Sequence, residues 1–387
     1  MLRPGTRTRL AAMAPSVIDL PALDVLIEAL RDGGYRVVGP TVRDGAIVYA
    51  DIDSAAQLPA GWTDRQQAGS YRLERRADEA RFGWAVGPHS WKPFLLVPVL
   101  RLWRARRSGG GALELEEEPA PDERLALVGV RPCDLAAIAV QDGVLLGGRY
   151  ADRDYAARRE GAFVVAVNCG EPGGTCFCAS LGTGPKAGDG YDLALTELLE
   201  GEHRFLAEAG SERGEELLAG LPRRKAGEAD VAAARRVTDG AAERMGRRLE
   251  AEGLRDLLAR NREHPRFDEV AARCLTCANC TLVCPTCFCT SVEDTTDLAR
   301  SEAGRVRSWD TCFSIQYSFL HGGSIRTSPK ARYRQWLTHK FGTWHDQFGR
   351  SGCVGCGRCI TWCPVGIDVT EELAAIRSGE EAAHAHD

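Results

Sequence analysis

Two short cysteine runs are the residues of this chain whose types and spacing indicate chemistry. The first, CLTCANCTLVCP, covers residues 274–285, and the second, CVGCGRCITWCP, covers residues 353–364. Both follow the pattern CxxCxxCxxxCP, in which three cysteines bind one [4Fe-4S] cluster and the fourth binds a neighbouring cluster. The proline after the fourth cysteine lacks an amide donor and redirects the chain. The two runs therefore predict two clusters close together, which is an arrangement for electron transfer.

The spacing groups the eight cysteines into two ligand sets. The first cluster is predicted to be bound by Cys274, Cys277, Cys280 and Cys363. The second cluster is predicted to be bound by Cys353, Cys356, Cys359 and Cys284. Structural zinc also uses CxxC pairs, but it needs only four ligands and leaves the third cysteine and the Cys-Pro step unexplained. Disulfides are disfavoured, because no secretory signal is visible and the cysteines are bunched.

A third group of cysteines lies in the N-terminal half of the chain. Cys133 and Cys169 each follow an apolar run that is typical of a strand, LALVGV and AFVVAV, and a glycine-rich loop with Cys176 and Cys178 comes next. If the two strands are parallel neighbours, their carboxyl ends bring the four thiols to one edge of a sheet. These four residues are therefore a candidate third cluster site, predicted to lie away from the other two clusters. The alternative is that they are small buried apolar side chains, although we expect Cys176 and Cys178 to be exposed in their loop.

Three further cysteines are expected to pack around the clusters. They are Cys287, Cys289 and Cys312.

Composition and missing motifs narrow the function. The chain has 387 residues, 44% hydrophobic and 27% charged, with a net charge of -5, which gives no support to nucleic-acid binding. No apolar run approaches the roughly 20 residues of a membrane span, and fifteen cysteines without a signal peptide indicate the reducing cytoplasm. We find no GxGxxG after a predicted strand, no GxxxxGK[ST], and no Ser-His-acid arrangement. We therefore expect a subunit that carries electrons and leaves catalysis to its partners.

Hydrophobic periodicity divides the chain into four parts. Residues 15–220 are predicted to form an α/β (or α+β) domain, with two strands around the Asp44-Gly45 turn and helices over RPCDLAAIAVQDGVL and YDLALTELLE. SGGGALELEEEPAPDER is predicted to be a surface loop. Residues 221–265 are expected to form a charged, solvent-facing helical bridge and residues 266–376 an α-helical, ferredoxin-like domain with two [4Fe-4S] clusters and an insertion. Residues 377–387 are expected to be a flexible tail.

The insertion between the two motifs is aromatic and basic, and it allows two interpretations. Its aromatic side chains can wrap the clusters and exclude water, which helps to set their potentials. Alternatively, its basic side chains form a docking face for an acidic partner, since Asp346 is the one acid nearby in the sequence. These basic residues are Arg326, Lys330, Arg332, Arg334, Lys340 and Arg350.

Several segments within roughly residues 120–375 together resemble a known family. They are GVRPCDLAAI, NCGEPGGTCFCASLGTGP, CTLVCPTCFCTSVEDTTD, YRQWLTHKFGTW and CVGCGRCITWCPVGIDVTEE. This set resembles the iron-sulfur beta subunit of cytosolic group 3b, or sulfhydrogenase-type, NiFe hydrogenases, and the corresponding iron-sulfur component of anaerobic sulfite reductase is similar. The resemblance implies a relay between a flavin subunit that handles NAD(P)H and the hydrogenase small subunit, which serves the NiFe large subunit. Alternatives are the same relay in a sulfite reductase complex, or an iron-sulfur oxidoreductase that binds its own flavin.

Overall fold

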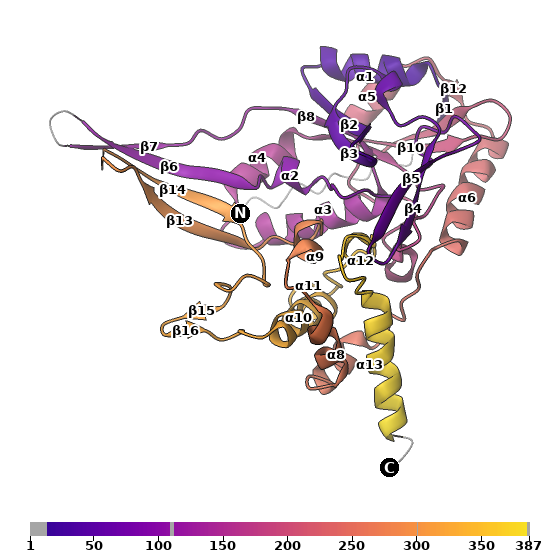
Figure 1. Cartoon of the computed structure of the whole chain (residues 1–387). Coiled ribbons are helices and arrows are strands. Elements are labelled where there is room, and N and C mark those ends of the chain that lie inside the picture. Colours follow the sequence, from indigo (N-terminus) through magenta and orange to yellow (C-terminus); the bar gives the residue numbers. More distant parts are fainter. Residues whose placement is uncertain (1–13, 109–111, 300, 385–387) are drawn as a thin grey trace.

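An eight-stranded mixed sheet organises the N-terminal half of the molecule (Figure 1). The computed structural model describes residues 14–108, 112–299 and 301–384. The four central strands, β2, β8, β9 and β10, run parallel, and the outer strands are antiparallel to their neighbours. In spatial order the strands are β12 (Arg224–Lys225), β1 (Ser16–Asp19), β11 (Arg204–Ala209), β10 (Leu193–Leu198), β9 (Phe163–Val167), β8 (Leu125–Val130), β2 (Arg36–Arg43) and β3 (Ala46–Asp51).

The central strands confirm the predicted α/β pattern, with one correction. β8 and β9 are adjacent and parallel, and helix α3 (Pro132–Leu145) follows β8 directly. Every residue of β8 and β9 is buried, as expected for parallel strands covered on both faces. The helix predicted over YDLALTELLE is wrong, because Leu193–Leu198 is strand β10. A short apolar run of this kind does not distinguish a strand from a buried helix, and pairing with β9 decides the outcome.

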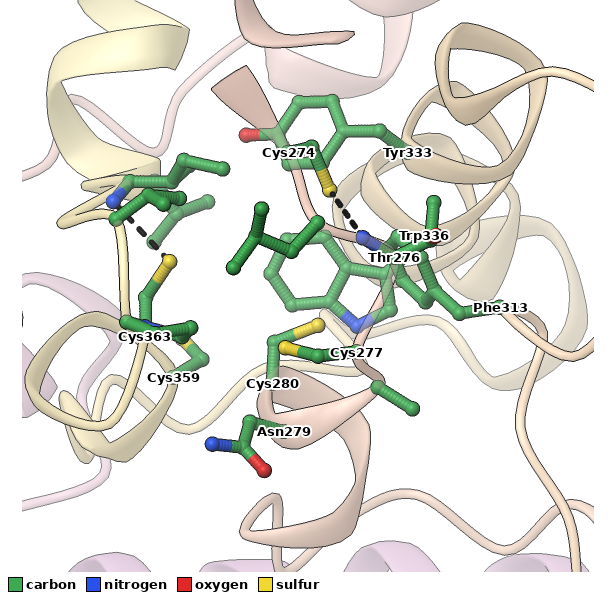
Figure 2. Close-up of a pocket in the computed structure, with 16 residues that line it drawn as sticks. Cys274, Thr276, Cys277, Asn279, Cys280, Phe313, Tyr333, Trp336, Cys359 and Cys363 are labelled. Atoms are coloured by element: carbon green, nitrogen blue, oxygen red, sulfur yellow. Dashed lines mark hydrogen bonds between the residues drawn. The ribbon is translucent and has the colours of Figure 1, made fainter.

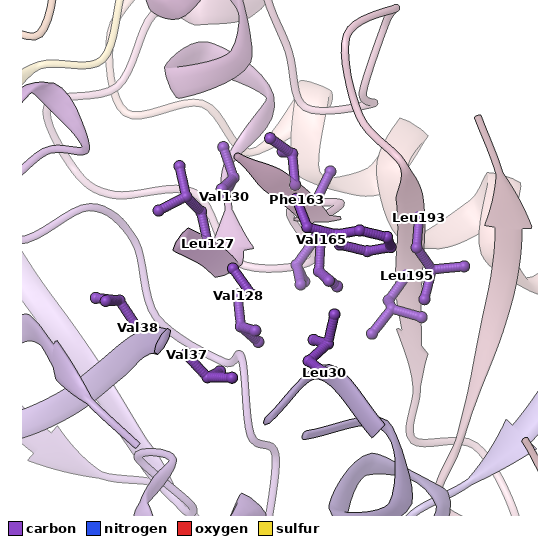
Figure 3. Packing of buried hydrophobic residues seen from close by; sticks show 14 of the residues in the cluster. Leu30, Val37, Val38, Leu127, Val128, Val130, Phe163, Val165, Leu193 and Leu195 are labelled. Carbon is purple, nitrogen blue, oxygen red and sulfur yellow. The ribbon is translucent and has the colours of Figure 1, made fainter. Parts of the chain in front are cut away.

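Helices cover both faces of this sheet. On one face, α1 (Ala22–Asp32) and α5 (Glu212–Ala219) close a large apolar core, in which Leu30 packs among Val37, Val128 and Val165 (Figure 3). On the other face, α6 (Glu228–Glu243) packs its alanines against Leu206 of β11. Residues 221–265 were expected to face solvent. Their helix α6 instead buries one side against the sheet. Each fully buried Leu, Ile or Val side chain contributes roughly 1.5–3 kcal/mol.

A second sheet joins segments from the two halves of the chain. It is antiparallel, and in Figure 1 it extends away from the main body as an arm. The prediction of a surface loop for SGGGALELEEEPAPDER is wrong at Leu113–Glu117, because these residues form a strand whose side chains are all exposed. Residues 109–111 lie outside the described residues. The arm consists of β13 (Thr290–Thr296), β14 (Glu302–Trp309), β6 (Val99–Arg107) and β7 (Leu113–Glu117).

The C-terminal part is mainly helical, but it is not all helix. It also contains β13, β14 and the small hairpin of β15 (Phe319–Leu320) and β16 (Gly323–Ser324), so strands accompany the predicted α-helical, ferredoxin-like domain. The prediction of a flexible tail is wrong for residues 377–384, which continue helix α13. Arg260 pairs with Glu380 of this helix. Residues 385–387 lie outside the described residues. The helices here are α7 (Leu254–Arg260), α8 (Arg266–Arg273), α9 (Asn279–Leu282), α10 (Pro329–Thr338), a π-helical turn (His339–Thr343), α11 (Trp344–Phe348), α12 (Arg358–Thr361) and α13 (Val369–His384).

Short elements complete the molecule. They are a helical turn (Ala55–Gln57), the hairpin β4 (Trp62–Gln67) and β5 (Ser70–Arg75), α2 (Lys92–Leu95), α4 (Arg153–Gly161) and a second helical turn (Cys178–Leu181). The described ranges contain no helix with both the length and the apolar character that a membrane crossing requires.

Candidate iron-sulfur sites

The two cysteine motifs fold along the same backbone path. In each motif, the second and fourth residues after the first cysteine adopt positive φ angles: Thr276 (51°) and Ala278 (66°) in the first, Gly355 (63°) and Gly357 (74°) in the second. A short helix, α9 or α12, then begins one residue before the third cysteine. Left-handed backbone costs a non-glycine residue roughly 1–2 kcal/mol, and such strain is typically stored at functional sites.

The first motif surrounds an apolar cavity (Figure 2). The backbone N–H of Thr276 donates to Sγ of Cys274 (3.4 Å), and the N–H of Ile367 donates to Sγ of Cys363 (3.3 Å). Aromatic side chains of Phe313, Tyr333 and Trp336 enclose it, while Cys277 remains exposed. The four cysteines that the spacing groups together, Cys274, Cys277, Cys280 and Cys363, all line this cavity.

A second apolar cavity lies next to the first. The backbone N–H of Gly355 donates to Sγ of Cys353 (3.4 Å). Trp336, Cys359 and Val369 line both cavities, so the two are adjacent. The other predicted set, Cys284, Cys353, Cys356 and Cys359, lines this second cavity together with Phe177, Lys340 and Phe341.

These donor sets fit [4Fe-4S] clusters. Each cavity is apolar and is lined by the four thiols of its predicted set, and amide hydrogen bonds reach the sulfur atoms, which is a feature that tunes cluster potential. In the described part of the chain, no three His, Cys, Asp or Glu side chains are arranged to hold one shared metal ion. In a cluster of this type, by contrast, the four thiolates are shared among four irons.

Two buried lysines lie near the second cavity: the sequence singled out Lys340 only for a docking face, and it did not single out Lys92. Lys340, only 4% exposed, donates from Nζ to Thr286 Oγ1 and to the Gly352 carbonyl (3.4 Å). Burial opposes its charge, but nearby thiolates, Cys284 first, outweigh burial and raise the pKa of Lys340. Lys92 donates to the Leu282 carbonyl (3.3 Å) and lies 4.0 Å from the Trp309 ring centre, and burial lowers its pKa.

Four of the six basic residues of the insertion are buried or paired within the chain, which disfavours the docking interpretation. Lys340 is buried against the second cavity, and Arg332, 3% exposed, donates to the Phe313 carbonyl (2.7 Å). Lys330 pairs with Asp268 (2.9 Å), and Arg334 pairs with Glu263. These acids come from outside the insertion, so local sequence composition did not reveal them. Because its aromatic side chains line the cavities, the segment fits the interpretation in which it wraps the clusters.

Two of the three extra cysteines, Cys287 and Cys312, lie near motif cysteines. Cys287 donates to Cys284, and this hydrogen bond, ahead of the Lys340 charge, lowers the pKa of Cys284. Cys312 is buried in the same apolar core as Cys363. Cys289 is half-buried.

The four N-terminal cysteines lie beside the second cavity, not away from it. Cys176 and Cys178 are buried, at 7% and 4% exposure, which corrects the expectation of an exposed loop. The reason is that their loop packs on the second motif: the Phe177 N–H donates to the Gly355 carbonyl (2.8 Å), and Sγ of Cys176 lies 3.8 Å from the Cys356 carbonyl. This close approach also explains Gly357, where a Cβ atom would lie 2.4 Å from the Thr175 carbonyl.

A buried ion pair fixes the second motif to the sheet domain. Arg358 of α12 binds both carboxylate oxygens of Asp134 in α3, at 2.9 and 3.1 Å, and both side chains are at most 1% exposed. Thr361 also donates to Gln66 Oε1 of β4 (2.7 Å). The N-terminal half thus forms one wall of the second site.

The geometry defines an iron-sulfur protein with two neighbouring cysteine sites, and comparison with known proteins agrees. A family model described as a 4Fe-4S dicluster domain matches residues 273–367. The chain is also 35% identical over 261 residues to sulfhydrogenase 2 subunit beta of Pyrococcus furiosus, which covers 67% of this chain and 75% of that protein. The chain therefore belongs to the family of sulfhydrogenase beta subunits, which confirms the resemblance found in the sequence. The family and the dicluster domain support an iron-sulfur electron-transfer role.

Proposed function

We propose that this chain relays electrons between an NAD(P)H-linked flavin subunit and the small subunit of a cytoplasmic NiFe hydrogenase, which serves the large subunit. The observation that carries this proposal is the pair of adjacent cavities, each lined by all four cysteines of its predicted ligand set, with Trp336 and Cys359 in the wall of both. Two clusters in these positions would be close enough to exchange electrons. The relative named sulfhydrogenase 2 subunit beta supports the hydrogenase partner.

The relay has a surface end and an interior end. Cys277 of the first ligand set is exposed, and Leu275 beside it is 60% exposed. Cys356 of the second set is buried against the sheet domain. A partner cluster or flavin therefore reaches the first cluster directly, whereas the second communicates through the first cluster or through the sheet domain.

A sulfite reductase complex is the alternative setting for the same relay, since only the terminal partner differs. A flavin site within this chain is less favoured. A polar cavity exists near the ends of β9 and β10, but its cations are engaged: Arg204 pairs with Asp230 (3.3 Å), Arg76 with Asp78 (2.7 Å), and Arg244 donates to the Gly170 carbonyl. These arginines are poorly suited to bind a flavin phosphate.

Replacing Cys277 by alanine should remove the first cluster and leave the second. The chain purified without oxygen is expected to lose about four irons, because a cluster that lacks one thiolate and faces solvent is lost. Iron and sulfide assays with low-temperature EPR measure the change. Cys289→Ala is the matched control, since Cys289 is half-buried and lines neither cavity. Zinc without iron in the wild-type chain would overturn the proposal.

The isolated chain should not reduce dyes with NAD(P)H, because it carries clusters but no nucleotide motif. Adding the flavin subunit should restore NAD(P)H-dependent reduction of both clusters, observed by their visible bleaching. Adding the hydrogenase subunits should then give NAD(P)H-dependent H2 evolution. Reduction of the clusters by NAD(P)H without any partner contradicts the relay, and coupling to sulfite instead of protons selects the alternative complex.

A further inference from the structure

Four thiols, three of them buried, gather at the carboxyl edge of the central sheet. Cys133 lies in the first turn of α3 just after β8, and Cys169 follows β9, the parallel neighbour of β8. Cys176 and Cys178 lie in the loop that continues from β9. The carboxyl edge of parallel strands is where open α/β sheets place their ligands. The sheet thus places Cys133 and Cys169 at one edge, and the loop that packs on the second motif brings Cys178 into the same apolar cluster as Cys133.

The four thiols are close enough to influence one another. Cys133 and Cys178 belong to a single apolar core cluster, which also contains Cys356 of the second motif. Burial first, and then the neighbouring thiols of Cys176 and Cys169, raise the pKa of Cys178. Burial and then Cys169 raise the pKa of Cys176 to about 12. All fifteen cysteines of the chain are free thiols, so disulfide bonding does not explain this gathering.

A buried cation faces this group. Arg131 is completely buried and donates to the carbonyls of Phe82 (2.9 Å) and Trp84 (2.6 Å). Among the described residues its Nε has no hydrogen-bond partner, and its contact with Cys169 partly offsets the effect of burial on the Cys169 pKa. A guanidinium buried in the interior is costly unless an anion compensates its charge. An iron-sulfur cluster held by four thiolates is such an anion.

Glycines keep the backbone close to two of the sulfurs. A Cβ atom at Gly184 would lie 2.9 Å from Sγ of Cys178, and one at Gly173 would lie 3.3 Å from Sγ of Cys176. Ordinary buried cysteines in a core are packed by side chains, whereas backbone brought this near to sulfur is suited to amide contacts with a cluster.

We propose that Cys133, Cys169, Cys176 and Cys178 bind a third [4Fe-4S] cluster, compensated by Arg131 and placed beside the second cluster. The inference rests on the proposed relay function and extends it. The order of clusters is then third, second and first, from the sheet domain to the exposed Cys277. A partner docked on the sheet domain can therefore exchange electrons with one docked at the first cluster.

Metal analysis of the full chain, purified without oxygen, tests this site. The wild-type chain should contain about twelve irons, and Cys176→Ser or Cys169→Ser should each lower the count to about eight while the EPR signals of the two motif clusters remain. Serine is close to cysteine in volume, so the sheet should stay folded, as circular dichroism can verify. Cys289→Ser is the control and should keep about twelve irons.

The outcomes separate this site from the relay itself. About eight irons in the wild type, lowered by Cys277→Ala but unchanged by Cys176→Ser and Cys169→Ser, would overturn the third cluster and leave the two-cluster relay standing. Bound zinc that disappears in Cys176→Ser would also overturn it. Absence of iron from the wild-type chain would reject the relay and the third cluster together.

Discussion

Replacing Lys340 by methionine is expected to lower the reduction potential of the second cluster by on the order of 100 mV. The ammonium group is buried in the wall of the second cavity, near the thiols of Cys284 and Cys353. A nearby positive charge stabilises the reduced, more negative cluster, and a dry site screens that charge weakly. Methionine keeps the length of the side chain and removes the charge. An anaerobic redox titration followed by EPR measures the shift.

The first cluster serves as an internal reference for this experiment, because Lys340 does not line its cavity. Lys330→Met is the matched control: it removes a lysine from the same segment, but one that pairs with Asp268 at the surface and lines neither cavity. Its effect should be small, since solvent and salt screen exposed charge. Equal shifts in the two variants would show that the Lys340 charge does not act on the second cluster.

Local sequence patterns predicted the centre of the fold and failed at its edges. The continuous apolar runs of β8 and β9 and the Asp44-Gly45 turn between β2 and β3 each carry enough local signal. The arm could not be predicted in this way, because β14 pairs with β6, a strand from the other half of the chain. Leu113 and Leu115 of β7 are 69% and 67% exposed. Because β7 has no buried face, its apolar residues do not indicate how the strand packs.

The cysteine motifs predicted the ligand sets, but not their surroundings. The fixed spacing alone groups four cysteines that all line the first cavity and four that all line the second, with Cys359 of the second set shared by both walls. Lys340 lies in the π-helical turn after α10 and is buried there. No residue type in the sequence predicts a π-helical turn. The pairing of Asp134 with Arg358 spans 224 residues of sequence. Asp134 and Arg358 each lie in a recognisable motif, but neither motif indicates that the two side chains pair.

The two motifs also differ in a way that only the structure explains. At equivalent left-handed positions the first motif has Thr276 and Ala278, and the second has Gly355 and Gly357. A Cβ atom at Gly355 would lie 2.7 Å from backbone atoms of Cys178. The glycines are therefore required by contact with the cysteine loop of the sheet domain, not by the motif itself. The N-terminal half is built around the second site.

Replacing Asp134 by asparagine is expected to destabilise the folded protein by about 3–5 kcal/mol, because it leaves the Arg358 guanidinium buried without a compensating charge. Both side chains are at most 1% exposed, so water cannot replace the carboxylate. The change should loosen the contact between α3 and α12 and expose the second site. Anaerobic denaturant unfolding, followed by tryptophan fluorescence, measures the loss.

Two further variants test the cause of that loss. Asp294→Asn removes a carboxylate from the exposed pair between Arg305 and Asp294 of the arm and should leave stability nearly unchanged, as is usual for surface pairs. Combining Asp134→Leu with Arg358→Met removes both buried charges and should recover much of the stability lost in Asp134→Asn, because apolar side chains of similar size often replace a buried ion pair without loss. If the double variant were as unstable as Asp134→Asn, the cost would come from altered packing and not from the unpaired charge. If the double variant recovers stability, the loss in Asp134→Asn comes from the unpaired Arg358 charge.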